Sequence, residues 1–199
     1  SFVLIVACTA FPAATVDISL VGAFFQSVSA RTAGFSTYPI GEFTDAGLFV
    51  LCILMFIGAS PGSTGGGIKT STFFTLFQSA RSVFSKKPIG AFRRSISPGN
   101  LNKAYLITML SLGVVCVGVF LMCLLEPEYT FLQLLFEVVS AFGTVGLSTG
   151  ITPHLGDAGK LVIIVIMFIG RLGAFTLLSI WISHPEPKAR FTEEMITIG

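Results

Sequence analysis

The chain has 199 residues, of which 53% are hydrophobic and only 11% are Asp, Glu, Lys or Arg. A soluble globular domain carries roughly 25% charged residues, so the composition excludes an ordinary soluble enzyme and indicates an integral membrane protein. The net charge is only +2, but residues 46–125 contain Lys and Arg without a single Asp or Glu. The positive-inside rule therefore places residues 81–103 in the cytoplasm and favours this interpretation over a nucleic-acid-binding patch.

The N-terminal part, residues 1–81, predicts one membrane unit. Residues 2–11 are typical of the end of a spanning helix, and we expect further residues upstream and no signal peptide, because neither Met nor a charged segment precedes them. Residues 18–30 are too short to cross a bilayer as a helix, which takes about 20 residues. A polar loop at residues 31–37 follows, and residues 45–81 form a second helix that glycines interrupt.

A basic linker at residues 82–102 leads to a second unit at residues 103–184, and residues 185–199 form a cytoplasmic tail. The second unit predicts, in order, a helix at 103–125, a short helix at 129–142, a loop at 143–149 and a helix at 157–184. A short helix followed by an irregular loop is typical of a re-entrant pore loop. Such backbone survives at membrane depth only where it is buried in protein or lines a cavity.

The two units repeat one another in sequence. Four segments of the second unit match the first at a spacing of 111 or 112 residues: FEVVSA (136–141) with FQSVSA (25–30), TVGLST (144–149) with TAGFST (32–37), DAG (157–159) with DAG (45–47), and MFIG (167–170) with MFIG (55–58). Each unit crosses the membrane twice, so both copies share one orientation. The sequence predicts an all-α membrane protein with two parallel helix–pore loop–helix repeats, half of a pseudo-four-fold cation pore.

The two loops have the composition of an ion-selectivity filter. Their central glycines permit unusual backbone dihedrals, and such loops can direct carbonyl oxygens at a dehydrated cation. They resemble the T-V-G-Y-G filter of potassium channels, changed at its last positions. We expect potassium to bind at backbone carbonyls of residues Thr32, Ala33, Gly34, Phe35 and Ser36 and of residues Thr144, Val145, Gly146, Leu147 and Ser148.

Four stretches carry a resemblance to a known family: SARTAGFST (29–37), MFIGASPGSTGGGIKT (55–70), SAFGTVGLST (140–149) and MFIGRLGAF (167–175). They resemble the Trk/Ktr/HKT superfamily of potassium transporters and are most similar to the Ktr-type bacterial membrane subunit. The resemblance implies that this chain is the C-terminal half, the third and fourth of four pore units. It also implies multi-pass insertion in the bacterial inner or plasma membrane.

The resemblance further implies an intramembrane gate below the filter. The expected gate residues are Gly58, Ser60, Pro61, Gly62, Ser63, Thr64, Gly65, Gly66, Gly67 and Arg171. Pro61 and the glycines cannot continue a helix cheaply. A nucleotide-binding P-loop is disfavoured here, because Ile68 separates Gly67 from Lys69. We expect Arg171 to be buried inside the protein, and Glu137, the counterpart of Gln26, to hydrogen-bond the filter backbone.

The implied function is potassium uptake, without enzymatic chemistry and without a cofactor bound by this chain. Two alternatives stay open: the ion-binding subunit of a potassium-pumping ATPase, and a sodium-permeable member of the same superfamily. A membrane enzyme is disfavoured, because Ser60, Ser63 and Thr64 have no nearby His or carboxylate as a base. The expected partners are the lipid bilayer, the missing N-terminal half, a second copy in a homodimer and a cytoplasmic nucleotide-binding ring.

Overall fold

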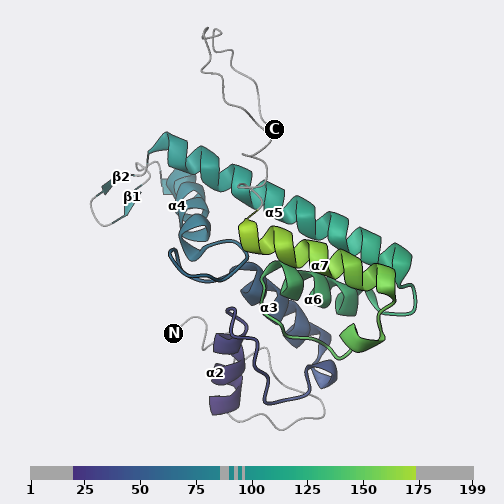
Figure 1. Cartoon of the computed structure of the whole chain (residues 1–199). Helices are drawn as coiled ribbons and strands as arrows, with labels where there is room; N and C mark the ends of the chain where they lie inside the picture. Colours follow the sequence, from purple (N-terminus) through teal and green to yellow (C-terminus); the bar gives the residue numbers. More distant parts are fainter. Residues whose placement is uncertain (1–19, 86–89, 92–93, 96, 174–199) are drawn as a thin grey trace, which may run out of the picture.

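The computed structural model describes residues 20–85, 90–91, 94–95 and 97–173, which are mainly helical (Figure 1). The elements in chain order are α2 (Leu20–Ser29), η1 (Ile40–Glu42), α3 (Asp45–Phe56), α4 (Thr70–Ser85), β1 (Gly90–Ala91), β2 (Arg94–Ser95), α5 (Pro98–Leu125), α6 (Phe131–Phe142), η2 (Thr152–His154) and α7 (Asp157–Leu172). β1 and β2 form a short antiparallel ladder in the linker, so this part is not wholly helical. The expected span end at 2–11 and the tail at 185–199 lie outside the described residues.

The second helix of the first unit is interrupted, and the two halves are α3 and α4. α3 begins after Thr44, whose hydroxyl accepts from the Gly47 amide at 3.3 Å. After α3, the Ile68 amide donates to the Phe56 carbonyl at 3.1 Å, which closes the base of the glycine-rich loop, residues 58–67. α4 continues to Ser85, four residues beyond the predicted end at 81, because residues 70–87 contain no proline or glycine.

Three predicted boundaries of the second unit were wrong. α5 begins at Pro98 instead of residue 103, since proline is well suited to the first turn of a helix. α6 begins at Phe131 instead of 129, because Thr130 and Gln133 form a reciprocal capping box before it. α7 ends at Leu172, because Gly173 has φ of 83°, and residues 174–184 of the predicted helix lie outside the described part.

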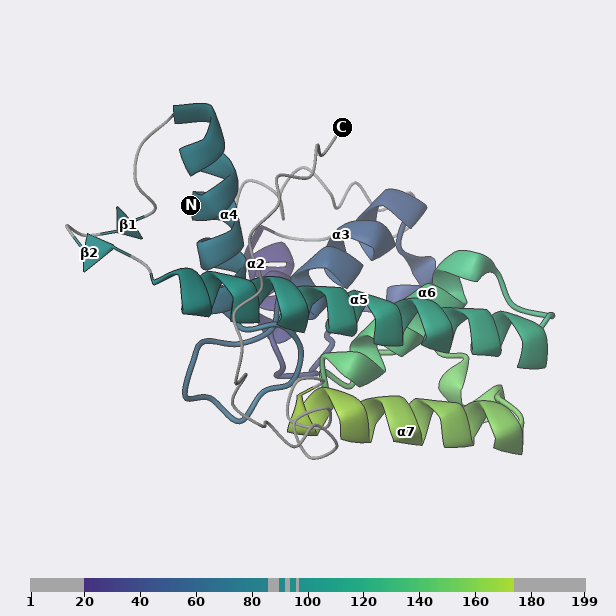
Figure 2. The same ribbon diagram turned by 90° about the horizontal axis from the view of Figure 1, so that it is seen from above.

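Helix α6 lies at the centre of the packing, with α3, α5 and α7 around it (Figures 1 and 2). Its residues Leu134, Phe136 and Val138 are almost completely buried. Side chains from the three surrounding helices complete one shared core: Leu51 and Met55 of α3, Val115, Val119 and Met122 of α5, and Ile166 of α7. The first and second units are therefore joined through apolar contacts, and α6 is held rigidly in place.

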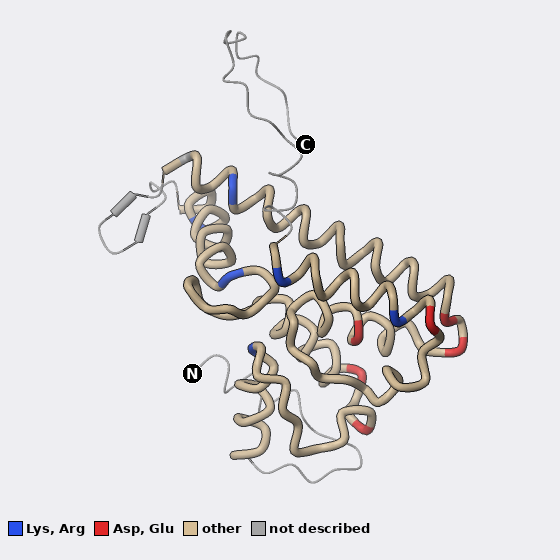
Figure 3. The backbone as a smooth tube through the Cα atoms, in the orientation of Figure 1, with Lys and Arg blue, Asp and Glu red and all other residues tan. Residues whose placement is uncertain are grey.

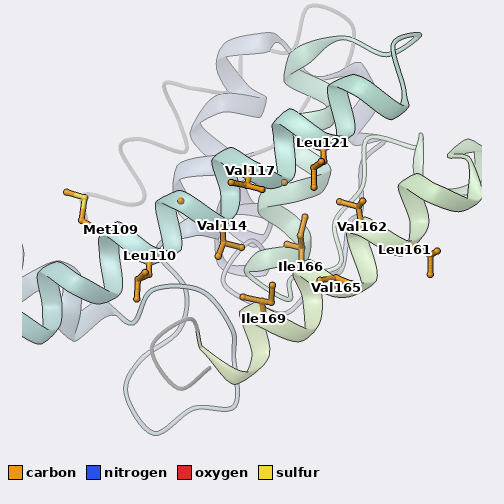
Figure 4. Close-up of a pocket in the computed structure, with 12 residues that line it drawn as sticks. Met109, Leu110, Val114, Val117, Leu121, Leu161, Val162, Val165, Ile166 and Ile169 are labelled. Atoms are coloured by element: carbon orange, nitrogen blue, oxygen red, sulfur yellow. The ribbon is translucent and has the colours of Figure 1, made fainter. Parts of the chain in front are cut away.

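Helix α5 is the one helix in the described part of the chain that is long and apolar enough to cross a membrane, judged by length and composition. α5 and α7 enclose an apolar groove of about 620 Å³ (Figure 4), lined by side chains of both helices. Many large apolar side chains on these helices are exposed, among them Met109, Phe120 and Phe168.

Acidic residues gather toward one end of the helices and most Lys and Arg toward the other (Figure 3).

The close packing of α7 on the end of α6 depends on Gly170. A Cβ at this position would overlap the carbonyl group of Phe142, so only glycine allows this approach. We predict that Gly170→Ala lowers the free energy of unfolding by about 1–3 kcal/mol through overpacking. Thermal unfolding of the detergent-solubilised full-length protein would measure this loss.

Gly113→Ala is the matched control, because a Cβ on Gly113 of α5 meets nothing within 4 Å. We expect this variant to be at least as stable as the parent protein, with a gain of up to about 1 kcal/mol, because alanine favours a helix interior over glycine. Equal stability of the two variants would contradict the close contact between α6 and α7.

Candidate functional site

The two loops that follow the short helices α2 and α6 lie directly against each other. A Cβ on Gly34 of the first loop would overlap the carbonyl oxygen of Val145 in the second. Residues 31–37 and 143–149 are thus brought together from positions more than a hundred residues apart in the sequence. Both loops also line one cleft, so a ligand in that cleft would meet residues of both.

Both loops adopt the same unusual backbone conformation. Thr32 and Thr144 have φ of 79° and 51°, and the glycines two residues later, Gly34 and Gly146, have φ of 78° and 92°. A positive φ is uncommon for any residue other than glycine and is strained for a β-branched one. Such strain persists only where surrounding contacts fix the backbone, and it clusters at binding sites.

Two serines fix these contacts in equivalent ways. The Ser140 hydroxyl donates to the carbonyl oxygen of Leu147 at 2.6 Å, and the Ser29 hydroxyl donates to the carbonyl oxygen of Phe35. Sequence reasoning did not assign a role to Ser29 or Ser140. The available signal was their identity in the repeated segments FQSVSA and FEVVSA, one turn before each loop.

Glu137 braces the second loop from behind. Its side chain is only 5% exposed. Oε1 accepts from the hydroxyl of Ser148 at 2.8 Å and from the amide of Thr149 at 2.9 Å, and Oε2 accepts from the hydroxyl of Thr152 at 2.6 Å. The predicted bond between Glu137 and the loop backbone is therefore present.

The first loop has a weaker brace at the equivalent position. Gln26 is 1% exposed, and its Oε1 accepts from the Ser36 hydroxyl at 3.4 Å. Its Nε2 is buried without a hydrogen-bond partner in the described part of the chain. The repeat thus conserves the shape of the two loops while the second is held by more and shorter hydrogen bonds.

The glycine-rich loop lies against the threonines of both loops. The Gly66 amide donates to the Thr144 hydroxyl at 2.9 Å. A Cβ on Gly65 would lie 2.9 Å from the Thr32 hydroxyl oxygen. Of the ten residues expected at the gate, Gly65 and Gly66 make these contacts, whereas residues 60–64 form the exposed part of the loop.

Arg171 reaches this exposed part from the end of α7. Its Nη1 donates to the carbonyl oxygen of Thr64. The side chain is exposed in this chain, so the expectation that Arg171 is buried was wrong. The reason is its position in the last turn of α7, from which it extends along the surface toward the loop.

On the side away from the glycine-rich loop, the two loops border an open cleft of about 440 Å³. It is lined by Gly34, Ser36 and the segments 38–42 and 146–150. The described residues contain no cluster of three His, Cys, Asp or Glu side chains suited to a metal ion. The lining residues include Ser36 and Ser148, which carry hydroxyls, and Glu42, which carries a carboxylate. Oxygen ligands of this kind suit a hard cation better than a transition metal.

Comparison with known proteins relates most of the chain to cation transporters. The family model described as "TrkH: Cation transport protein" matches residues 6–190. Ktr system potassium uptake protein D of Bacillus subtilis is 43% identical over 181 residues, which cover 88% of this chain and 39% of that protein. Ktr system potassium uptake protein B of Vibrio alginolyticus is 39% identical, over 90% of this chain and 39% of that protein.

Among solved structures, the crystal structure of the potassium transporter TrkH from Vibrio parahaemolyticus has the same fold. Its TM-score is 0.72 at 24% identity, over 90% of this chain and 42% of that one. The chain thus spans about two fifths of the length of the proteins that it matches. The likeness confirms the expected fold, that of a partial helical pore domain.

The brace at Glu137 yields a direct test. Glu137→Gln replaces one acceptor oxygen by an NH₂ group, so at least one of the buried donors that Glu137 now satisfies loses its partner. We predict a loss of about 1–3 kcal/mol in the free energy of unfolding. Chemical denaturation of the full-length protein in mixed micelles would measure it.

Glu128→Gln is the control, because Glu128 is an exposed carboxylate just before α6. The same change of charge there should leave stability within about 0.5 kcal/mol of the parent protein. If both variants unfolded alike, the hydrogen bonds of Glu137 would not hold the loop.

Proposed function

The chain belongs to the TrkH family of cation transport proteins, and from this we propose that it forms half of a potassium-conducting pore in the cell membrane. Ions would pass along an axis beside the contact of the loops 31–37 and 143–149 and bind to backbone carbonyls of both. The names of the relatives, potassium uptake proteins, support this choice of ion. Passage through such a pore requires no covalent chemistry.

One observation carries the proposal: two strained loops of equal conformation meet at Gly34 and Val145. A selectivity filter needs several backbone segments around one axis, each held firmly enough for its carbonyls to replace the water around an ion. The serine bonds at the ends of α2 and α6 supply that rigidity in both loops. An ordinary surface turn would require neither the strain nor the buried hydrogen bonds.

We propose that the glycine-rich loop, residues 58–67, is the gate of this pore. Gly65 and Gly66 lie against Thr32 and Thr144, directly below the strained part of both loops. A segment in this position obstructs the route between the loops. Its glycines favour movement, because they leave the backbone free to change its dihedrals.

The remaining pore would come from parts of the protein that this chain does not include. Residues 1–81 would form the third unit, residues 82–102 a cytoplasmic linker, and residues 103–184 the fourth. Two further units of an N-terminal half would close the ring, which fits the coverage of only 39% of the relatives. We also propose a homodimer and a cytoplasmic nucleotide-binding ring as partners.

The filter glycines provide the test of this function. A side chain at Gly34 would be unfavourable for two reasons: the residue has φ of 78°, and a Cβ would overlap the carbonyl oxygen of Val145. Gly146 also has a positive φ, 92°, but a Cβ there would meet nothing within 4 Å. We predict that Gly34→Ala lowers potassium flux at least tenfold and that Gly146→Ala has a smaller effect, on the order of a few-fold, because only strain acts there. Flux would be measured with the full-length protein in liposomes.

Gly99→Ala serves as control, since Gly99 lies in the first turn of α5 with nothing within 4 Å, and its flux should equal that of the parent protein. Sodium flux is measured in parallel. Equal rates for both ions would favour the sodium-permeable alternative. The proposal would be wrong if the parent protein passed neither ion, or if the potassium flux of all three variants were the same.

A further inference from the structure

Gln26 lies behind the first loop at the position that Glu137 has behind the second, on the equivalent helices α2 and α6. Both side chains are almost completely buried. Glu137 is surrounded by donors, because it accepts from the hydroxyls of Ser148, Thr149 and Thr152 and from the Thr149 amide. The first loop offers Gln26 no matching set of donors.

The Ser36 hydroxyl does not hold Gln26 firmly. Its oxygen lies 2.6 Å from the Tyr38 carbonyl oxygen and 3.4 Å from Gln26 Oε1. A hydroxyl group has one proton to donate, and the shorter contact takes it. In the second loop the equivalent hydroxyl, that of Ser148, lies 2.8 Å from Glu137 Oε1. The brace behind the first loop is therefore weaker than its sequence position alone indicates.

A second donor is lost because an apolar residue replaces a hydroxyl-bearing one. Thr152 is the first residue of η2 and donates to Glu137 Oε2 at 2.6 Å. Ile40 is the first residue of η1, at the same position of the repeat, and it has no hydroxyl. The side chain of Ile40 is 4% exposed and belongs to the apolar core. Gln26 thus has no counterpart of the shortest bond that Glu137 makes.

Buried polar atoms without a partner gather around the first loop. Within the described residues they are Gln26 Nε2, Ser27 Oγ and Thr32 Oγ1, and none of them belongs to α6 or to the second loop. Buried polar groups are normally hydrogen-bonded, because a missing bond costs free energy. The Ser29 bond to the Phe35 carbonyl remains as the side-chain bond that ties the first loop to α2.

We infer that Gln26 is a selectivity-determining residue: it leaves the first loop free to yield, so this loop limits how well the pore distinguishes potassium from sodium. The inference rests on the proposed function, because it concerns the filter of that pore. A loop that yields can bring its carbonyls closer to Na⁺, the smaller ion. A firmly braced loop keeps them at the distance that suits K⁺.

The experiment transfers the brace of the second loop to the first. Gln26→Glu combined with Ile40→Thr recreates the carboxylate and the hydroxyl found at Glu137 and Thr152. The full-length protein is reconstituted in liposomes, and potassium and sodium flux are measured separately. We expect the ratio of potassium to sodium flux to rise about threefold or more, part of the roughly tenfold factor that one hydrogen bond to a charged group supplies.

The reciprocal exchange, Glu137→Gln with Thr152→Ile, should lower the same ratio, because it gives the second loop the weak brace of the first. Gln133→Glu is the matched control. Gln133 closes the capping box at the start of α6, and glutamate fills that role equally well. Its flux ratio should equal that of the parent protein.

The sign of the change separates bracing from a simple effect of charge. A carboxylate that acted through its charge alone would strengthen the field at the carbonyls and favour Na⁺. A falling flux ratio in the Gln26→Glu variants would therefore overturn the inference. The single variant Gln26→Glu is made as well, in case the double variant does not fold.

Hydrogen exchange gives a second readout that does not depend on ion flux. Exchange of the backbone amides of residues 33–37 is followed by mass spectrometry in the full-length protein in detergent. We expect it to slow about tenfold in the double variant, in line with a new hydrogen bond to a charged group, and to stay unchanged in Gln133→Glu. Faster exchange would show that the Gln26 amide is better bonded than a carboxylate and would overturn the inference.

The two readouts distinguish this inference from the proposed function. An unchanged flux ratio in a protein that conducts potassium would overturn the role of Gln26 and leave the pore intact, whether or not exchange slows. Slower exchange in a protein that conducts neither ion would support the brace and overturn the proposed function.

Discussion

The contact between Gly34 and Val145 is the constraint on which the rest of the site depends. Backbone of one loop meets backbone of the other at a distance that admits no side chain. This approach places Thr32 and Thr144 together above the glycine-rich loop. It also requires the helices behind the loops to be fixed, which the shared core around α6 provides for the second loop.

The two loops share their conformation and differ in how they are supported. A serine one turn before each loop bonds the carbonyl after the central glycine in both. Behind the second loop stands the Glu137 carboxylate with short hydrogen bonds. Behind the first stands the Gln26 amide, which makes one hydrogen bond, at 3.4 Å, within the described part of the chain. Because charged acceptors form stronger hydrogen bonds than neutral ones, the second loop is the more rigid of the two.

The glycine-rich loop combines freedom of backbone with cationic partners at its carbonyls. Lys69 directly precedes α4, and Arg171 lies in the last turn of α7. Because both bind the loop, its position depends on where α4 and α7 lie relative to each other. In the described residues, Arg171 donates to a loop carbonyl, and Lys69 donates to two loop carbonyls and to the Ser63 hydroxyl. The same kind of oxygen that would bind a passing ion in the filter is here satisfied by the protein itself.

Much of the architecture could be predicted from the sequence, because bilayer thickness and helix-breaking residues constrain it strongly. The internal repeat identified both loops, and glycines with Pro61 marked the break between α3 and α4. The boundaries at Pro98, Thr130 and Gly173 were missed, because capping and positive φ act locally and apolar periodicity does not register them.

The sequence by itself determined that two equivalent units exist and which residues form their loops, because pattern and spacing are properties of the chain. Only the tertiary structure decided which atoms meet. Three contacts depend on distances between backbone segments: the close approach of Gly34 to the Val145 carbonyl, the hydrogen bond from Arg171 to Thr64 and the hydrogen bond from Lys69 to Gly65. Those distances are set by how α3, α5 and α7 pack around α6, and no local pattern encodes them.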